Sequence, residues 1–292
     1  MIKILIIGSG TMGRSLTELF LQNDVSVFLY DKNKEVLRDT ENYIKQKNFK
    51  NKNFNILKNI PVYLNVNIII ETVSEVLNIK KEVIENIEKY VPKETIICSN
   101  TSGLPLSEIG KNMNIPERFI GMHFYTPSTI IPLVEVIKSQ FTSERTAKTT
   151  YDFLVKVGKK PVLLKREIPG FIGNRIQHVI MREALFLLEK EVASIEDIDE
   201  IIKWSVGVRL AINGPFEQRD INGIDTHLNI ANYLYETLNN CESPSYILQE
   251  KLENKHLGIK TLRGFYDWSE QDLKAYYKYK DEKLTDILEL LK

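Results

Sequence analysis

The sequence predicts an α/β fold in which an N-terminal doubly wound sheet is followed by an all-helical domain. Short apolar runs alternate with helical patterns through the first half of the chain. A glycine-rich turn follows the first of these runs directly, and the pattern becomes almost entirely helical after Pro169-Gly170. Alternating β and α units are typical of a mostly parallel sheet with helices on both faces.

The first apolar run, Ile2–Ile7, is short, rich in β-branched residues and closed by glycines, as buried parallel strands are. Apolar residues then recur at helical spacing from Met12 to Phe20. Further strands are expected at Val25–Tyr30, Asn67–Val73, Thr95–Cys98, Phe119–Met122 and Leu133–Ile137. Together these elements predict a sheet of the Rossmann type.

The change of pattern near residue 168 predicts a domain boundary. We expect a Rossmann domain over residues 1–167 and a helical domain over residues 168–292. An apolar stripe at helical spacing opens the second domain: Ile172, Ile176, Val179, Ile180 and Leu187. The stretch Lys45–Lys58 is rich in Lys and Asn, and we expect a solvated loop or a frayed helix there.

Composition excludes several functional classes. The 39 basic and 39 acidic side chains cancel, which argues against a surface built to attract nucleic acid or an anionic membrane. No apolar run approaches the roughly 20 residues needed to span a bilayer, and no secretory signal precedes the first strand. Cys98 and Cys241 are far apart without metal-ligand spacing. We therefore expect two free thiols, no metal site and a cytoplasmic protein.

The turn between the first strand and the first helix matches the pattern GxGxxG: Gly8, Gly10, Thr11, Met12 and Gly13 lie in it. In this strand–turn–helix context the first glycine allows a tight turn and the second lets the backbone approach a pyrophosphate. The third lets the helix pack closely on the strand. The N-terminus of the helix would then face the phosphates of a dinucleotide.

Asp31 lies eighteen residues beyond Gly13, at the carboxyl end of the second strand. A carboxylate there accepts hydrogen bonds from the adenosine ribose hydroxyls and repels a 2′-phosphate, which favours NAD over NADP. Lys32 and Lys34 soften this preference without reversing it. The alternative is a structural glycine turn in which Asp31 only caps a helix.

His123 is the candidate acid/base because it ends a predicted strand, where ligands bind in a parallel sheet. Its ordinary pKa near 6.5 suits proton transfer from an alcohol. The other three histidines lie in segments with helical patterns. Glu135 stands inside an otherwise apolar strand, where a carboxylate needs a partner. Two interpretations stay open from these residues alone: a His123–Glu135 dyad, or an unrelated buried salt bridge.

Five motifs resemble those of the L-3-hydroxyacyl-CoA dehydrogenase family. The segment from Gly121 to Val136 resembles its GMHFFNP…LVEV, and Ser99–Ser102 resembles its SNTS turn. Asn67–Glu75 resembles its VIEAVxE strand, and Pro169–Arg175 matches PGFxxNR. Gly258–Tyr266 resembles the ending GKKTGxGFY. Together with the first strand and its glycine-rich turn, the matches extend in order from residue 4 to about residue 268, and the five motifs together are highly specific.

The resemblance implies reversible hydride transfer between NAD and a 3-hydroxy/3-keto pair. It implies that His123 is the general acid/base, that Glu135 orients it, and that Ser102 and Asn174 hydrogen-bond the substrate oxygen. Asn174 would place the active site between the two domains, and a homodimer through the helical domain is implied. The implied cofactor contacts are the glycine loop, Asp31, Glu75, Lys80, Asn100 and Lys260.

Three departures bear on the substrate. Only 36 residues separate Asp31 from Ile68, so the helical hairpin with which the family grips coenzyme A is much reduced. Thr126 replaces the Asn of HFFNP, which removes an amide near the nicotinamide. Val208–Ile212 and Gly214–Glu217 look more like the lambda-crystallin and carnitine dehydrogenase branch, whose members oxidise free hydroxy acids.

Three hypotheses follow. The first is a dehydrogenase of short 3-hydroxyacyl thioesters, carried on coenzyme A or on an acyl carrier protein. The second is a dehydrogenase of a free 3-hydroxy acid such as carnitine or a sugar acid. The third is a nucleotide-binding protein without catalysis, against which the presence of Ser102, His123, Glu135 and Asn174 argues.

Overall fold

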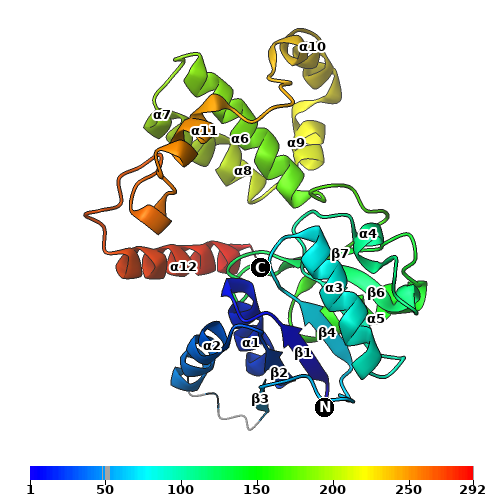
Figure 1. Cartoon of the computed structure of the whole chain (residues 1–292). Helices are drawn as coiled ribbons and strands as arrows, with labels where there is room; N and C mark the ends of the chain where they lie inside the picture. The colour runs from blue at the N-terminus through cyan, green and yellow to red at the C-terminus, as the bar shows by residue number, and fades with distance from the viewer. Residues whose placement is uncertain (48, 50–52, 292) are drawn as a thin grey trace. The chain divides into compact units, whose positions relative to one another are not determined.

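The computed structural model describes residues 1–47, 49 and 53–291 of the chain (Figure 1). They divide into two units, Met1–Asn174 and Arg175–Lys292. The first unit extends seven residues beyond the boundary expected from the sequence. The turn after Pro169 explains this difference, because Phe171 is buried in the core of the first unit and the backbone N–H of Ile172 donates a hydrogen bond to Glu135.

In the described part of the chain, eight strands form one sheet in the order β3-β2-β1-β4-β5-β6-β7-β8. Neighbouring strands are parallel, apart from β6 and β7, which are antiparallel. The strands are β1 (Lys3–Ile7), β2 (Ser26–Tyr30), β3 (Phe54–Leu57), β4 (Ile68–Glu71), β5 (Ile96–Ser99), β6 (Phe119–Phe124), β7 (Leu133–Ile137) and β8 (Lys160–Leu164). The strand order reverses between β1 and β4, which is where dinucleotides bind in such sheets.

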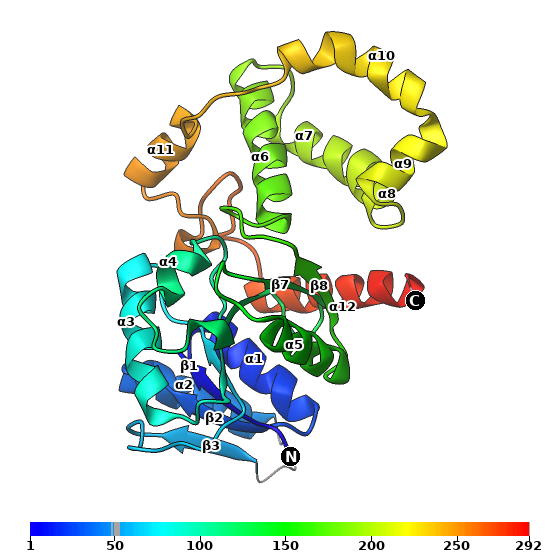
Figure 2. The same cartoon turned by 90° about the vertical axis from the view of Figure 1, so that its right-hand side faces the viewer.

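Helices cover both faces of this sheet (Figure 2). One face packs against α1 (Thr11–Gln22), α2 (Lys34–Gln46) and α5 (Glu144–Lys156), and the other against α3 (Leu77–Ile87) and α4 (Leu106–Gly110). Alternate strand residues serve the two cores, because successive side chains of a strand point to opposite faces. Two short turns of 3-10 helix complete the unit: η1 (Glu88–Tyr90) and η2 (Pro116–Arg118).

The six strands expected from the sequence are present, and the predicted fold class is confirmed. The expectation for Lys45–Lys58 is wrong for Phe54–Leu57, which pair with β2 as strand β3. Residues 48 and 50–52 of that stretch lie outside the described residues. Strand β8 was not expected either. Both are edge strands with half-exposed residues, so neither forms the continuous apolar run of a buried strand.

The second unit is helical. Its helices are α6 (Gly173–Glu189, which begins in the first unit), α7 (Ile195–Ile201), η3 (Ile202–Gly207), α8 (Val208–Leu210), α9 (Pro215–Asn222), α10 (Ile224–Leu234), η4 (Tyr235–Thr237), α11 (Tyr246–Glu253), η5 (Ile259–Thr261) and α12 (Leu273–Leu290). Of its described residues, only Leu185 and Ile198 are buried. None of the helices among the described residues is both long and apolar enough to cross a membrane.

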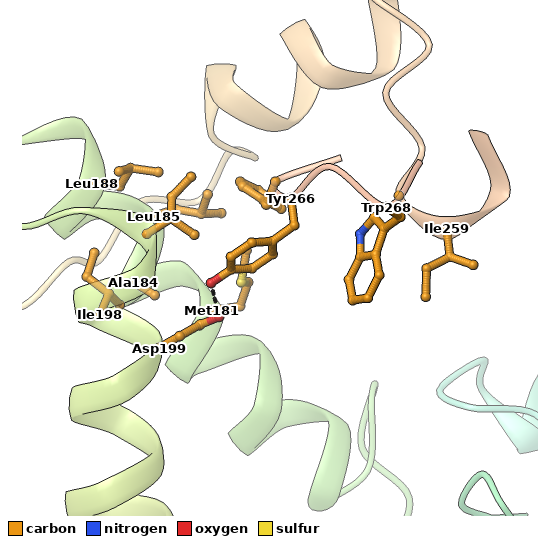
Figure 3. Close-up of a pocket in the computed structure, with 12 residues that line it drawn as sticks. Met181, Ala184, Leu185, Leu188, Ile198, Asp199, Ile259, Tyr266 and Trp268 are labelled. Atoms are coloured by element: carbon orange, nitrogen blue, oxygen red, sulfur yellow. Dashed lines mark hydrogen bonds between the residues drawn. The ribbon is translucent and has the colours of Figure 1, made fainter. Parts of the chain in front are cut away.

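An apolar hollow of about 330 Å³ lies within the helical unit, between α6, α7 and the segment around η5 (Figure 3). Leu185, Ile198 and Trp268 line it. The Tyr266 hydroxyl donates a hydrogen bond of 2.7 Å to Asp199 beside it. The GFY segment of the last motif is thereby anchored to α7.

Candidate active site

The glycine-rich turn leaves its middle glycine open. Gly8 has a positive φ of 102°, and a Cβ atom there would lie 2.8 Å from the carbonyl oxygen of Thr72. A Cβ on Gly13 would lie 1.9 Å from the carbonyl oxygen of Gly8. A Cβ on Gly10 would meet no atom within 4 Å. Close packing of the backbone therefore requires glycine at positions 8 and 13. At Gly10, by contrast, the open space fits the approach of a pyrophosphate to the backbone.

Thr11 and Met12 form the first turn of α1, which begins directly after Gly10. Its unpaired N–H groups fit a phosphate, because backbone donors and the positive end of the helix dipole coincide there. The Thr126 hydroxyl donates to the sulfur of Met12 at 3.0 Å. The residue that departs from the family's HFFNP motif thus lies against the start of α1.

Asp31 connects the glycine turn to the end of β2. Its Oδ2 accepts hydrogen bonds from the backbone N–H of Ser9 at 2.7 Å and from the Ser9 hydroxyl at 2.9 Å. Its Oδ1 accepts from the backbone N–H of Asn33 at 2.8 Å. A carboxylate has about four acceptor positions, so capacity is left for a ribose hydroxyl.

His123 and Glu135 are directly opposite each other on the antiparallel strands β6 and β7. Both residues are buried, with 4% and 3% exposure, and His123 Nδ1 lies 2.8 Å from Glu135 Oε2. Because an ionised carboxylate only accepts, the hydrogen of this bond belongs to Nδ1. Nε2 is then the nitrogen that can take a proton from a substrate.

Glu135 receives hydrogen bonds on both oxygens. Oε1 accepts from the backbone N–H groups of Ile172 at 3.0 Å and Gly173 at 3.1 Å. Oε2 accepts from the Tyr125 hydroxyl at 2.8 Å as well as from His123. Burial opposes ionisation, but these hydrogen bonds outweigh it and hold the pKa of Glu135 below its ordinary value. The dyad therefore contains a carboxylate.

A second buried carboxylate, Glu71, ends strand β4. Lys80 of α3 donates to its Oε1 at 2.8 Å and to the carbonyl oxygen of Val73 at 3.1 Å. The hydroxyl of Ser99, its neighbour on β5, donates to Oε2 at 2.6 Å. Burial raises the pKa of Glu71, and the Lys80 ammonium is the strongest opposing influence. Lys80 was expected to contact the cofactor, and the structure places its ammonium inside this cluster.

Glu75 links the cluster to the SNTS turn. Its Oε1 accepts from the Thr101 hydroxyl at 2.6 Å and from the backbone N–H of Ser102 at 2.7 Å. Its Oε2 lies 3.2 Å from the Lys80 ammonium. The Asn174 amide donates to the carbonyl oxygen of Ser102 at 2.8 Å. Ser102 and Asn174, both expected to hold the substrate oxygen, are thus brought together.

Asn100 and Lys260 complete the expected set. Asn100 is nearly buried, and its Oδ1 accepts from the backbone N–H of Phe124 at 3.0 Å, which joins the ends of β5 and β6. Lys260 lies in η5 of the second unit, so its contact with the cofactor stays a prediction.

Glu71 and Tyr125 received no role from the sequence, and neither did the hydroxyl donors Ser9, Ser99 and Thr101. The signal for Glu71 was present, because a carboxylate follows three isoleucines in an apolar strand, as in the case of Glu135. The signal for Tyr125 was a tyrosine where the family's HFF has a phenylalanine. Neither signal reveals the partner without the register of the strands.

Known families match both parts of the chain. Residues 3–168 match the model of the 3-hydroxyacyl-CoA dehydrogenase NAD binding domain, and residues 170–268 match that of the C-terminal domain. The chain belongs to the 3-hydroxyacyl-CoA dehydrogenase family. It is an NAD-dependent oxidoreductase, as the matched binding domain and the dehydrogenases among its relatives show.

Individual relatives in this family differ in substrate. The chain is 32% identical over 288 residues to a probable 3-hydroxybutyryl-CoA dehydrogenase of Bacillus subtilis, which covers 92% of this chain and 98% of the relative. It is also 32% identical over 224 residues to the 5-formyl-3-hydroxy-2-methylpyridine 4-carboxylate 5-dehydrogenase of Mesorhizobium japonicum, covering 77% and 72%.

Solved structures show the same two kinds of relative. A 5-formyl-3-hydroxy-2-methylpyridine 4-carboxylic acid 5-dehydrogenase, described as an NAD+ dependent dismutase, matches with a TM-score of 0.93 and 28% identity over 100% of this chain and 99% of that one. The 3-hydroxybutyryl-CoA dehydrogenase of Escherichia coli K12 matches with a TM-score of 0.74 and 27% identity, covering 91% and 59%.

Proposed function

We propose that this enzyme interconverts a 3-hydroxyacyl and a 3-ketoacyl group on a short acyl thioester, with NAD as its cofactor. The observation that carries the proposal is the His123–Glu135 pair, buried and joined at 2.8 Å at the carboxyl end of β6. The family supports the substrate class, because its members named above include 3-hydroxybutyryl-CoA dehydrogenases.

In the proposed reaction the nicotinamide of NAD supplies the hydride acceptor. His123 Nε2 takes the hydroxyl proton of the substrate during oxidation and returns it during reduction. Glu135 keeps the hydrogen on Nδ1 and stabilises the imidazolium that forms. Ser102 and Asn174 hold the substrate oxygen, and the Asn174–Ser102 hydrogen bond fixes their relative positions.

The cofactor would bind along the carboxyl edge of the sheet. Gly10 and the first turn of α1 would receive the pyrophosphate, and Asp31 the adenosine ribose. The open space at Gly10 supports this placement. In this proposal Lys80 acts through Glu71 and Glu75, and positions the turn that carries Ser102.

A free carboxylic acid is the second candidate substrate, and two observations favour it. First, α2 is a single helix of 13 residues, and seven residues connect it to β3. That length leaves much less room for the helical hairpin with which the family grips coenzyme A. Second, the pyridine carboxylate dehydrogenase matches the whole chain with a TM-score of 0.93, against 0.74 for the Escherichia coli acyl-CoA enzyme.

One set of assays distinguishes these substrates. NADH oxidation is followed with acetoacetyl-CoA, the same acyl group on an acyl carrier protein, free 3-keto acids and an aromatic aldehyde carboxylate. The thioester proposal expects kcat/KM for a thioester to exceed that for the matching free acid by tenfold or more. The reverse order contradicts it in favour of the second candidate. Tight NADH binding without turnover on every substrate would contradict both.

The His123→Ala variant tests the mechanism. Its turnover should fall by about 10²–10⁴-fold, because the acid/base is lost, whereas NADH affinity should change little. Near-normal turnover would contradict the role assigned to Nε2. Circular dichroism of the variant provides the control for folding.

We also propose that the protein is a cytoplasmic homodimer that associates through its helical unit. Large apolar side chains of this unit are strongly exposed in the single chain, among them Trp204 at 66% and Phe216 at 88%. Exposed apolar surface on this scale is typical of an interface. Light scattering should therefore give twice the chain mass, and Phe216→Lys should shift it toward one chain. A wild-type monomer at micromolar concentration would contradict the proposal.

A further inference from the structure

The hydroxyl of Tyr125 shares the carboxylate oxygen that orients His123. Both donors lie 2.8 Å from Glu135 Oε2. The His123 and Tyr125 rings also lie next to each other, with 4.7 Å between their centroids and an angle of 54° between their planes. In the family segment GMHFFNP the corresponding residue is phenylalanine, which has no hydroxyl. The third member of the cluster therefore departs from that family segment.

Gly173 provides the space for this hydroxyl. A Cβ atom on Gly173 would lie 1.8 Å from the Tyr125 hydroxyl oxygen and 2.8 Å from its Cζ atom. The Gly173 backbone N–H donates to the other oxygen of Glu135. The tyrosine and the glycine therefore form a matched pair, because a side chain at 173 would displace the hydroxyl from the carboxylate.

Tyr125 acts as a donor in this arrangement. Burial and the hydrogen bond to Glu135 raise the pKa of Tyr125, so the hydroxyl keeps its proton over the working range of pH. Two titratable groups face the His123 ring: Glu135 of β7, and Tyr125, which directly follows β6. The turn before α6 contributes the Phe171 ring, 5.6 Å from the His123 ring, and the N–H group of Ile172; the N–H group of Gly173 comes from the first residue of α6.

We propose that Tyr125 is a positioning residue that tunes the dyad: its hydroxyl weakens the hold of Glu135 on the protonated His123 ring. An oxygen that accepts two hydrogen bonds offers less negative charge to each donor. Glu135 therefore holds the protonated imidazole less tightly than it would with a phenylalanine at 125. The inference rests on the proposed function, in which His123 is the acid/base.

The sign of the effect differs between the two directions of reaction. Oxidation of the alcohol needs the neutral imidazole, and reduction of the ketone needs the protonated one. Tyr125→Phe should move the pH midpoints of both directions upward by about half to one unit, because one donor to a charged oxygen is lost. Below the midpoint, oxidation should slow by about three- to tenfold, whereas reduction should persist to higher pH.

The decisive measurement is an NMR titration of the His123 ring, assigned by its absence in His123→Gln. The midpoint should move upward in Tyr125→Phe and stay unchanged in Tyr151→Phe, a matched control on the exposed face of α5. Gly173→Ala should give the same upward shift in the wild-type background. It should add little to the shift in Tyr125→Phe, because the hydroxyl that it displaces is already absent.

An unchanged ring titration in Tyr125→Phe would overturn the inference. Loss of rate by the same factor in both directions at every pH would also overturn it, because a purely structural role has that signature. Failure of the proposed function looks different: His123→Ala would retain turnover, while the ring titration would still differ between the native protein and Tyr125→Phe.

Discussion

Replacing Lys80 by methionine should destabilise the first unit while leaving the described cofactor surface in place. Lys80 is 1% exposed, and its ammonium lies 2.8 Å from Glu71 and 3.2 Å from Glu75. Methionine fills similar space but leaves Glu71, which is fully buried, without its cation. Removal of one partner of a buried ion pair costs about 3–5 kcal/mol.

That loss is large against the roughly 5–15 kcal/mol by which a domain is stable. At about 2–4 °C per kcal/mol for a unit of this size, the melting temperature should fall by roughly 6–20 °C. Lys81→Met is the matched control, because Lys81 is partly exposed and its partner Glu108 is 3.6 Å away. An exposed pair of that kind contributes at most about 1 kcal/mol.

The pH dependence of the deficit has a definite sign. Burial raises the pKa of Glu71 in the folded protein, and loss of Lys80 removes the strongest opposing influence, so the pKa rises further. Between the unfolded and folded pKa values the native state binds the extra proton, so stability falls as pH rises through this window. The free energy of unfolding that Lys80→Met loses relative to the wild type should therefore be larger at pH 8 than at pH 5.5.

The assay must report on the correct unit. Both tryptophans, Trp204 and Trp268, lie in the second unit, so their fluorescence is unsuitable. Hydrogen exchange of the β4 and β5 amides, followed during urea unfolding, reports on the first unit. A loss below about 1 kcal/mol, or a deficit that grows as pH falls, would refute the reasoning. A large loss of NADH affinity at unchanged stability would instead support the direct contact between Lys80 and the cofactor that the sequence predicts.

Three further predictions concern the cofactor loop and the dyad. Asp31→Ala should weaken NAD binding by roughly 10–100-fold and reduce discrimination against NADP, because charge-assisted hydrogen bonds to the ribose are lost. Isothermal titration calorimetry with both cofactors measures this, and an unchanged ratio of the NAD and NADP affinities would contradict it. Gly13→Ala should cost at least about 1–3 kcal/mol in urea unfolding, because its Cβ would lie 1.9 Å from the Gly8 carbonyl oxygen. Gly10→Ala should keep wild-type stability, since its Cβ meets no atom within 4 Å, but it should lose NADH affinity because the Cβ would occupy the space proposed for the pyrophosphate. The opposite pattern for the two glycines would contradict the roles assigned to them. Glu135→Gln should lower turnover by about 10²–10⁴-fold with little change in NADH affinity, because an amide NH₂ facing Nδ1 selects the wrong imidazole tautomer. Stopped-flow measurement of the rate of hydride transfer tests this prediction, and a loss of rate below tenfold would contradict it.

Much of the first unit could be predicted from the sequence because its central strands are buried on both faces. Such strands are continuous apolar runs, as in Ile4–Ile7 and Ile68–Ile70, and glycines or turns end them. The edge strands β3 and β8 lack this signature, since several of their residues are exposed. The expectation of a loop or frayed helix over Lys45–Lys58 failed at Phe54–Leu57 for that reason.

The candidate site was predictable where a residue is chemically out of place. Glu135 stands among valines and a leucine, and the sequence alone indicates that it needs a partner. The same reasoning applies to Glu71, although its partner Lys80 lies nine residues away on a helix. Tyr125 is not chemically out of place, because a tyrosine at a strand end needs no special partner, and only the structure places Gly173 at the start of α6 beside its hydroxyl.

The register of the sheet determines both buried carboxylate sites. His123 lies opposite Glu135, and Ser99 lies opposite Glu71, each pair on adjacent strands. Successive side chains of a strand alternate in direction, so a slip of β7 by one residue would turn Glu135 toward the core that Val134 and Val136 now fill. That would bury a carboxylate without its donors, at a cost of several kcal/mol. The apolar alternation that folds β7 therefore also enforces the pairing of the acid with the imidazole, and any substitution that weakens this register should reduce catalysis before it unfolds the sheet.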